Sequence, residues 1–455
     1  MAIQKITDFS AVTTLLTSDI LPIVVTPGST PVNKKITLGN FLAQKTLVTV
    51  GTVDGADYVC SGTADDVQIQ EAIDTVTTNG GIVFIRAGTY NITSTILVKD
   101  NVCIQGEGRT TLIKGVAGLN GPIFQNSEYV DSYASTDVYN TGITIRDLKI
   151  DGNNSVLTTG EIAGIRMANA KKILIDHVEI INTRGFAAIY LGRNEYTPGG
   201  IGDWSVAIEA EWWVTNCLID GHKGNANASA GIWVLGLNRV TKDVHVINNT
   251  IKNCGQTDVA ADGEGIHASK GVCNVEIIGN IIHDNCNKGI NIGGIDDYAT
   301  SRTNNITVMG NIIYNLAGVL NTYVRGIDVG GNWDRVQIIG NIVHDINASG
   351  ISLRTESVPN TSKAIVKGNI FENCGKDTTM SLARDRCGIT VTNSVSQYIT
   401  IEGNTCTDTQ DVKTQTYGIW GGANNLTIIG NNFYGNLTGP SVLSTNVMYA
   451  LNRED

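Results

Sequence analysis

The sequence predicts an all-β protein wound into a solenoid of about 10–11 coils, and three observations support this prediction. A unit that is clearest at residues 265–292 repeats along the chain, and its central asparagine recurs at spacings of 27 to 35 residues. The recurring positions are Asn249, Asn280, Asn311, Asn341, Asn369, Asn404 and Asn431. The apolar runs between them are short, rich in Ile and Val, and bounded by Gly, Asn and Asp, as strands are. No run in the repeats keeps the periodicity of an amphipathic helix, and units this short cannot hold two helices.

Each unit is expected to form three short parallel strands that bury their apolar side chains in a core shared with the adjacent coils. We expect the repeated asparagines to occupy one-residue bends with positive φ, a conformation that Asn tolerates. Their side chains can also hydrogen-bond to one another along the solenoid axis. Residues 51–438 are assigned to this solenoid, and residues 439–455 are expected to form only a C-terminal tail.

Residues 1–50 differ from the repeats and are predicted to form a small separate module. An apolar run at 20–25 is followed by a turn rich in Pro, Gly, Ser and Thr at 26–33, and then by the segment Lys34-Lys35-Ile36-Thr37-Leu38. The module is followed by the only well-formed helical pattern, at about residues 65–78. Its apolar positions follow helical spacing and are Ile69, Ala72, Ile73 and Val76. A solenoid has an open apolar end, and we expect this helix to cover it.

Composition excludes several classes of protein. The net charge is −11 and no basic patch stands out, which argues against a nucleic-acid partner. No apolar run approaches the roughly 18–20 residues of a membrane span, so no membrane insertion is expected. The nine cysteines include no C-x-x-C pair and are expected to be mostly buried free thiols. The first twenty residues lack the pattern of a secretory signal, so we expect synthesis in a cytoplasm without export.

The repeated V-x-I-x-G-N-x-I and G-I-x-V units resemble the right-handed parallel β-helix of the pectate-lyase-like superfamily. That superfamily includes pectin and alginate lyases, polygalacturonases, mannuronan epimerases and phage tailspike depolymerases. The segment D-D-x-x-x-I-Q-x-A-I-D followed by G-G-x-V and A-G-T-Y is similar to the opening segment of the epimerases and tailspikes. The pieces K-I-T-D, D-x-L-P-x-V-V and K-K-x-T-L in residues 1–50 resemble the N-terminal modules of phage tail fibres and tailspikes.

The resemblance implies a tailspike of the depolymerase type: a homotrimer, made in the host cytoplasm and carried in the phage tail of the virion. Its N-terminal module would attach to other virion tail proteins and help trimerisation, and its β-helix would bind and degrade a bacterial surface polysaccharide. A glycosidase is the first expectation and a lyase the second. A non-catalytic receptor-binding or structural tail protein, and a stand-alone polysaccharide lyase, are the alternatives. One departure argues against epimerase chemistry, because the epimerases' Tyr-Gly-Phe-Asp-Pro-His segment is here Arg-Gly-Phe-Ala-Ala-Ile at 184–189.

Within the superfamily, substrate lies along one outer sheet, and strand alternation identifies the side chains that would face it. In each G-I-x unit the Ile points inward and the next residue outward. The outward row is Arg166, Tyr190, Trp233, His267, Asn291, Asp328, Ser352, Thr390 and Trp420. Because adjacent coils lie about 4.8 Å apart, His267, Asn291 and Asp328 are expected to form a line about 10 Å long.

Three kinds of chemistry fit this row. Glycoside hydrolysis needs two carboxyl groups, for which the candidates are Asp328, Asp296, Asp297 and Glu264. Polysaccharide β-elimination needs a base and a cation, for which the candidates are His267 with Tyr190 or Tyr323, and Arg166 or Arg325. In the third case the row only binds glycan, with Trp233 and Tyr190 as stacking platforms and Asn291 beside them. No cofactor is expected; structural calcium at 296–297 is left open, without a calcium-loop motif.

Overall fold

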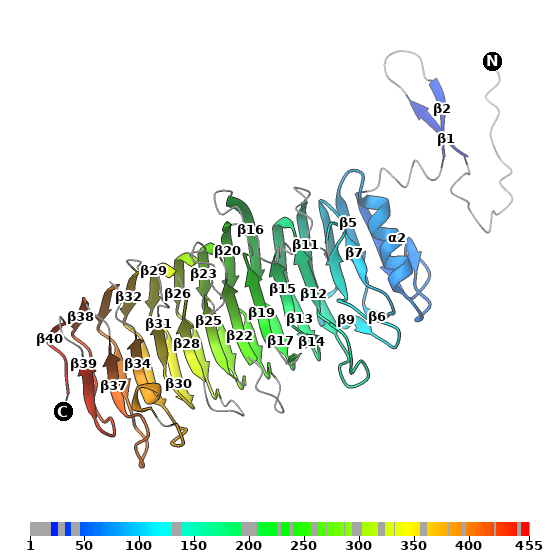
Figure 1. Cartoon of the computed structure of the whole chain (residues 1–455). Helices are drawn as coiled ribbons and strands as arrows, with labels where there is room; N and C mark the ends of the chain where they lie inside the picture. The colour runs from blue at the N-terminus through cyan, green and yellow to red at the C-terminus, as the bar shows by residue number, and fades with distance from the viewer. Residues whose placement is uncertain are drawn as a thin grey trace, which may run out of the picture.

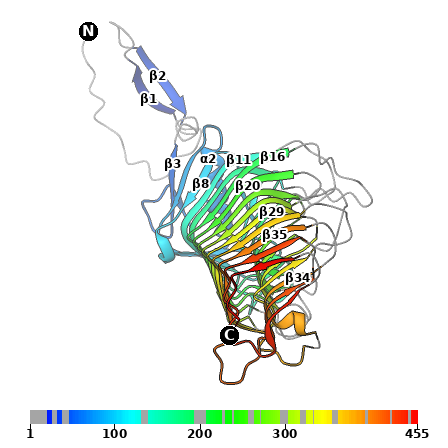
Figure 2. The same cartoon turned by 90° about the vertical axis from the view of Figure 1, so that its left-hand side faces the viewer.

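The computed structural model shows a right-handed parallel β-helix, which confirms the predicted fold (Figure 1). The structure describes residues 20–25, 32–37, 46–129, 139–192, 207–224, 229–236, 240–255, 263–269, 271–285, 287–293, 303–316, 324–331, 333–354, 362–380, 382–392, 397–422, 425–443 and 447–454. Most coils contribute one strand to each of three parallel sheets that run along the solenoid. Figure 2 looks along the stack and shows the strands of successive coils lying over one another.

The first sheet carries the predicted outward row and has twelve strands. They are β7 (Ile96–Val98), β10 (Phe124–Asn126), β12 (Ile165–Ala168), β15 (Ala187–Gly192), β19 (Ser229–Leu235), β22 (Gly263–Ser269), β25 (Lys288–Ile292), β28 (Arg325–Val329), β31 (Ile351–Arg354), β34 (Cys387–Thr392), β37 (Tyr417–Gly421) and β39 (Gly439–Leu443). All their pairings are parallel, as expected where each coil returns to the same sheet one turn later.

The other two sheets meet at a sharp corner in each coil. The second sheet contains β3 (Leu47–Gly51), β5 (Gly81–Ile85), β8 (Val102–Gln105), β16 (Ala207–Thr215), β20 (Val240–Ile247), β23 (Val272–Ile278), β26 (Thr303–Met309), β29 (Trp333–Ile339), β32 (Ser362–Lys367), β35 (Gln397–Glu402), β38 (Leu426–Ile429) and β40 (Val447–Ala450). The third contains β6 (Gly88–Ile92), β9 (Thr111–Gly115), β17 (Leu218–Asp220), β21 (Thr250–Lys252), β24 (Ile281–His283), β27 (Ile312–Tyr314), β30 (Ile342–Ile346), β33 (Ile370–Cys374) and β36 (Thr405–Thr407). Two long strands, β11 (Asn140–Asp151) and β13 (Ala170–Ile181), pass through both sheets.

A few short elements lie outside this pattern. They are β1 (Ile20–Val25), β2 (Val32–Thr37), β4 (Tyr58–Val59), β14 (Arg184–Gly185), β18 (Lys223–Gly224), and the 3₁₀ turns η1 (Gly108–Thr110) and η2 (Ala383–Arg386). Strands β1 and β2 form an antiparallel hairpin. The helix α2 (Asp66–Val76) lies at the N-terminal end of the solenoid, where its apolar face joins the core (Figure 1). The helix therefore covers the open end of the core at the predicted place.

The solenoid extends beyond both predicted boundaries. Strand β3 starts at Leu47 and pairs with β5, so the first coil begins inside the segment assigned to the N-terminal module. Strands β39 and β40 pair with β37 and β38, so residues expected to form only a tail continue the first and second sheets. Both extensions carry apolar residues that lengthen the same core.

The repeated asparagines form a buried ladder at the corner between the second and third sheets. The side-chain oxygen of each asparagine accepts hydrogen bonds from the backbone and side-chain amides of the asparagine one coil earlier, for example Asn311 to Asn280 at 2.9 Å. The ladder runs from Asn249 to Asn431 and ends on Asn452. The hydrogen-bonded ladder was predicted correctly, but the positive φ was assigned to the wrong residue. The residue before each asparagine has it, such as Gly279 at +66°, because this leaves the asparagine free to point into the core.

Replacing Asn311 by alanine should lower the free energy of unfolding by about 2–4 kcal/mol, because several buried groups lose their partners. The side chain accepts from the amides of Asn280 and donates to the Ile277 carbonyl and to Asn341. Urea unfolding followed by circular dichroism would measure the change. Gln337→Ala, on the exposed face of β29, is the matched control and should differ little from the unchanged protein. Equal stability of the two variants would contradict the ladder's stabilising role.

Candidate functional site

The first sheet brings the whole predicted outward row into one line. Each member pairs in register with the next, from Arg166 and Tyr190 at one end to Thr390 and Trp420 at the other. The preceding isoleucines, such as Ile266, Ile290 and Ile327, are fully buried in the core. The alternation that the sequence predicted is therefore present, and the outward row lies on the solvent side of the sheet.

A second row of residues lies three positions before each member of the outward row. This second row is charged in the middle of the sheet. It contains Glu264, Lys288 and Arg325, which precede His267, Asn291 and Asp328, respectively. A glycine follows each charged residue and lets adjacent coils approach closely. A Cβ at Gly289 would lie 2.6 Å from the Gly326 carbonyl oxygen and 2.5 Å from Ile313. The two rows can therefore touch across neighbouring coils.

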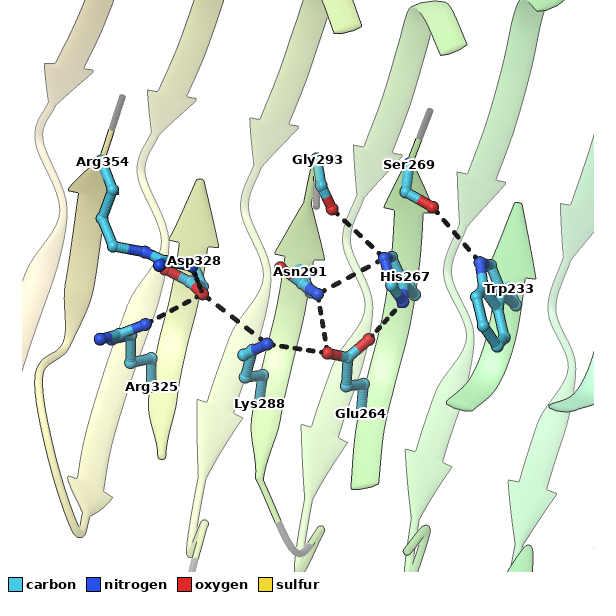
Figure 3. Close-up of polar contacts among 10 residues, drawn as sticks. All are labelled: Trp233, Glu264, His267, Ser269, Lys288, Asn291, Gly293, Arg325, Asp328 and Arg354. Atoms are coloured by element: carbon cyan, nitrogen blue, oxygen red, sulfur yellow. Dashed lines mark hydrogen bonds and ion pairs between the residues drawn. The ribbon is translucent and has the colours of Figure 1, made fainter. Parts of the chain in front are cut away.

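Glu264 lies at the centre of the first half of this network (Figure 3). Its side chain is only 1% exposed, and its Oε2 lies 2.6 Å from Nδ1 of His267. Its Oε1 accepts hydrogen bonds from Lys288 Nζ at 3.0 Å and from Asn291 Nδ2 at 2.7 Å. The other imidazole nitrogen, Nε2, lies 3.3 Å from the Gly293 carbonyl oxygen. Glu264 thus orients the histidine ring from one side.

Asp328 organises the second half of the network and is fully buried. Arg354 donates to both of its oxygens, at 3.2 and 2.9 Å, in a bidentate ion pair. Arg325 Nη1 donates to Oδ2 at 3.1 Å, and Lys288 Nζ lies 3.8 Å from the same oxygen. Lys288 therefore lies between the two carboxylates and links the halves of the network.

The neighbouring charges keep both carboxyl groups ionised. Burial by itself raises the pKa of Glu264, but the charges of His267 and Lys288 outweigh burial and lower this pKa to about 2. Burial likewise opposes ionisation of Asp328, yet its three cationic neighbours hold the pKa of that carboxyl well below its usual range. Neither group is suited to act as a proton donor near neutral pH, because a general acid needs a raised pKa.

Glu264 should make stability depend on pH in acid. Its folded pKa of about 2 is below the unfolded value near 4.3, so its contribution is complete above about pH 5 and is lost as pH falls toward 2. The contribution at neutral pH is on the order of 3 kcal/mol. Unfolding by urea at a series of pH values would test this by comparing the unchanged protein with Glu264→Gln. The stability difference should be constant above pH 5 and narrow below it; a constant difference down to pH 2 would contradict the assigned shift.

Aromatic side chains continue the row on the N-terminal side of His267. The Trp233 ring stacks on the imidazole, with centroids 4.9 Å apart and planes 4° apart, and Tyr190 meets Trp233 edge-on at 6.2 Å. The Arg166 guanidinium lies over the rings of Tyr190 and Tyr129. Burial raises the pKa of the Tyr190 phenol, which therefore stays neutral.

A pocket of about 170 Å³ lies among these aromatic residues. It is lined by Glu161, Ala163, Arg166, Phe186, Ala187, Tyr190, Trp233 and Leu235. The second row supplies alanine here, at Ala163, Ala187 and Ala230, and the following two coils supply Glu264 and Lys288. The small side chains leave room for a ligand beside the charged network. Trp233 lines this pocket and also stacks on His267 of the network.

The structure brings together most of the residues that were predicted for the site. Glu264, His267, Asn291, Arg325 and Asp328 form one network, and Arg166, Tyr190 and Trp233 line the adjoining pocket. Asp296, Asp297 and Tyr323 lie outside the described residues.

Two residues of the network, Lys288 and Arg354, were missed by the sequence analysis. Lys288 had a usable signal, since it precedes Asn291 by three residues as Glu264 precedes His267. Arg354 follows Ser352 by two residues and so lies on the same face of β31.

Metal-binding clusters, membrane-spanning helices and the state of the cysteines can be described for the placed residues of the chain. It contains no group of three His, Cys, Asp or Glu side chains arranged to hold a metal ion. Among the described ranges, no helix is both long and apolar enough to span a membrane. The eight described cysteines are free thiols, and seven of them are buried.

Comparisons with known proteins place the chain among parallel β-helices. The sequence model of the family described as "Rhamnogalacturonase A/epimerase, pectate lyase-like" matches residues 59–291. No curated protein sequence matches the chain. The A-module of the mannuronan C-5 epimerase AlgE4 from Azotobacter vinelandii is 17% identical with a TM-score of 0.50, covering 88% of this chain and 99% of that one. The surface protein and adhesin PfbA of Streptococcus pneumoniae is 14% identical with a TM-score of 0.54, covering 87% and 97%.

A viral structure is also similar. Tailspike protein 3 of bacteriophage CBA120 is 13% identical with a TM-score of 0.49, and the match covers 95% of this chain and 66% of that one. At these identities, the likeness of AlgE4 and PfbA to this chain shows a shared fold and nothing further.

Proposed function

The chain belongs to the pectate lyase-like family of rhamnogalacturonase A and epimerases, and from this premise we propose that it binds and cleaves an acidic polysaccharide along its first sheet. The observation that carries the proposal is the contact between His267 and the ionised Glu264, whose other oxygen is paired with Lys288. A base and a fixed cation in one site are what β-elimination of a uronate requires. Trp233 and Tyr190 extend the site as surfaces on which sugar rings stack.

The imidazole is the base in this mechanism. We assign the imidazole proton to Nδ1, which faces the ionised Glu264, and the basic lone pair to Nε2, which Asn291 Nδ2 approaches at 3.4 Å. Nε2 removes the proton from the carbon next to the uronate carboxylate, and the electron pair forms a double bond as the bond to the leaving oxygen breaks. The imidazolium, stabilised by Glu264, then returns the proton to that oxygen. Lys288 and Arg325 offset the charge that builds on the carboxylate in the transition state.

Hydrolysis by the pair Glu264 and Asp328 fits the electrostatics less well. Glycoside hydrolysis needs one carboxyl group protonated as the general acid, and the pKa of each of these is lowered. Asp328 is also fully buried and is held by Arg354 on both oxygens, which leaves it no open side toward a substrate. We therefore assign Asp328 to positioning the cations and Glu264 to orienting His267.

Incubation with a panel of uronate polysaccharides tests this proposal with two simultaneous measurements. Elimination creates one unsaturated sugar, detected by ultraviolet absorbance, for each new reducing end. Reducing ends without that absorbance would overturn the proposed elimination and favour a glycoside hydrolase. Binding of a polysaccharide with neither signal would support the alternative of a non-catalytic receptor-binding protein.

We further propose that the protein is a homotrimeric tailspike of a phage virion that acts on a bacterial surface polysaccharide. The support is the resemblance of residues 1–50 to tail-fibre and tailspike modules, together with the antiparallel pairing of β1 and β2 in that segment. Light scattering of the purified full chain, followed by electrophoresis in SDS without heating, is the test. A trimer that resists SDS is expected, and a monomer would overturn the tailspike assignment and favour a stand-alone lyase.

A further inference from the structure

A second hollow lies on the outer face of the second sheet, away from the network on the first sheet. It occupies about 450 Å³ across four successive strands, β26, β29, β32 and β35 (β29 and β35 are labelled in Figure 2). Two rows of side chains border it. One row is Asn305, Arg335, Lys363 and Tyr398, and the other is Thr307, Gln337, Ile365 and Thr400. The four strands span about 14 Å, the length of a short oligosaccharide rather than of a single ion.

Two residues of the core-facing row line the hollow from beneath. That row runs beneath the two bordering rows, and from β11 to β40 its members are Ile143, Ile173, Trp212, Val244, Val275, Ile306, Val336, Ala364, Ile399, Leu426 and Val447. Ala364 is the smallest of them, and it lines the hollow together with Val336.

The backbone of the bordering row is held in an uncommon conformation. Asn305 and Arg335 have φ near +54° and +51°, a region that favours glycine and tolerates asparagine better than arginine. In the preceding coils, asparagine and aspartate at this position form a side-chain ladder from Asp243 through Asn274 to Asn305. Arg335 ends that ladder at the hollow. Lys172 and Glu211 have the same conformation at this position of earlier coils, so a charged side chain can occupy it.

The lining is cationic although the protein as a whole is acidic. It contains Arg335 and Lys363, both exposed, and its described members include no carboxylate. Arg335 is oriented by two hydrogen bonds to Asn304 Oδ1, at 3.1 and 2.7 Å, with Asp334 3.7 Å away. Tyr398 is 56% exposed and offers a ring face beside Lys363.

We propose that this hollow is a second binding site, specific for a short acidic oligosaccharide. Arg335 and Lys363 would form ion pairs with the acidic groups, and Tyr398 would stack on a sugar ring. The amides and hydroxyls of the other row would hydrogen-bond to sugar hydroxyls. The net charge of −11 opposes long polyanions, so a short chain is the better ligand. The site is separate from the proposed cleavage site and does not depend on any activity there.

Calorimetric titration of the full chain with oligogalacturonate, and with its neutral methyl ester, tests this site. The acid form should bind and the ester should not. The double variant R335Q/K363Q should weaken binding of the acid form about tenfold or more, since charged hydrogen bonds are lost. The single variant Y398A should also weaken binding of the acid form. The K367Q variant is the matched control, because Lys367 lies on the same strand but outside the hollow, paired with Glu402.

The variant Trp233→Ala, which removes a stacking surface of the first sheet, separates this site from the first sheet. Binding that survives W233A and K367Q but is lost in R335Q/K363Q supports the proposal. Binding that R335Q/K363Q leaves unchanged, equal binding of acid and ester, or no binding at millimolar oligogalacturonate would each overturn it. All the substituted pocket side chains are exposed, so the variants should melt at the temperature of the unchanged protein, which thermal unfolding checks.

Discussion

Replacing Asp328 by alanine is expected to lower the free energy of unfolding by about 3–5 kcal/mol, the cost of breaking a buried ion pair by removing one partner. Asp328 is fully buried and receives hydrogen bonds from Arg325 and Arg354, with Lys288 close by. Without the carboxylate, three cations would face one another in a poorly hydrated part of the sheet. Mutual repulsion would then add to the lost hydrogen bonds. Urea unfolding followed by circular dichroism would measure the loss.

A matched control for this variant is Glu402→Ala. Glu402 also pairs with a lysine, Lys367 at 3.2 Å, but both side chains are exposed, and such surface pairs contribute 0–1 kcal/mol. The contrast isolates burial as the cause of the larger effect. A stability loss in Asp328→Ala no greater than that in Glu402→Ala would show that the cations find other partners and that Asp328 does not organise the network.

Replacing His267 by glutamine is expected to reduce cleavage of the polysaccharide by about 10²–10⁴-fold, the usual contribution of a positioned general base. Glutamine is similar in size and can still meet Glu264, but it cannot take a proton from the substrate at neutral pH. Binding of the polysaccharide should change far less, because Trp233 and Tyr190 remain in place. The measurement is the initial rate of unsaturated-sugar formation on whichever polysaccharide the panel identifies, with binding followed separately.

His344→Gln serves as the control for this second variant. His344 also pairs with a carboxylate through Nδ1, at 2.8 Å from Asp345, but it lies on β30 in the third sheet. The His344 variant should keep full activity. If His267→Gln also kept activity within a few-fold, His267 would not be the base, and the proposed elimination would be wrong.

Much of the fold and the face of the site could be predicted from the sequence because both follow from local rules. The apolar runs and the recurring asparagine predicted the stacked coils, and the twofold alternation of a strand decided which side chains point outward. For that reason all nine members of the outward row, from Arg166 to Trp420, were predicted correctly. The asparagine ladder was predicted by the same reasoning, since one residue per coil at a constant place must meet its copies.

The errors and omissions arose where a contact depends on packing between coils. Positive φ at the corner was assigned to asparagine, whereas the side chain of Asn280 is needed in the core and Gly279 makes the bend. Lys288 was overlooked because its role depends on two carboxylates from other coils. Those carboxylates, Glu264 and Asp328, are separated by loops of different length, so sequence distance does not predict that a single ammonium group reaches both.

The sequence by itself therefore determined the coil, its inward and outward faces, and the residues available to the site. Only the tertiary structure decided which of those residues touch, which are buried, and which charges balance. The physical reason is that alternation along a strand is a property of the local backbone, whereas ionisation depends on every charge within a few ångströms, whatever its place in the chain. Asp328 shows the difference most clearly: the alternation predicted its outward position, but Arg325, Arg354 and Lys288 decide that it stays ionised and buried.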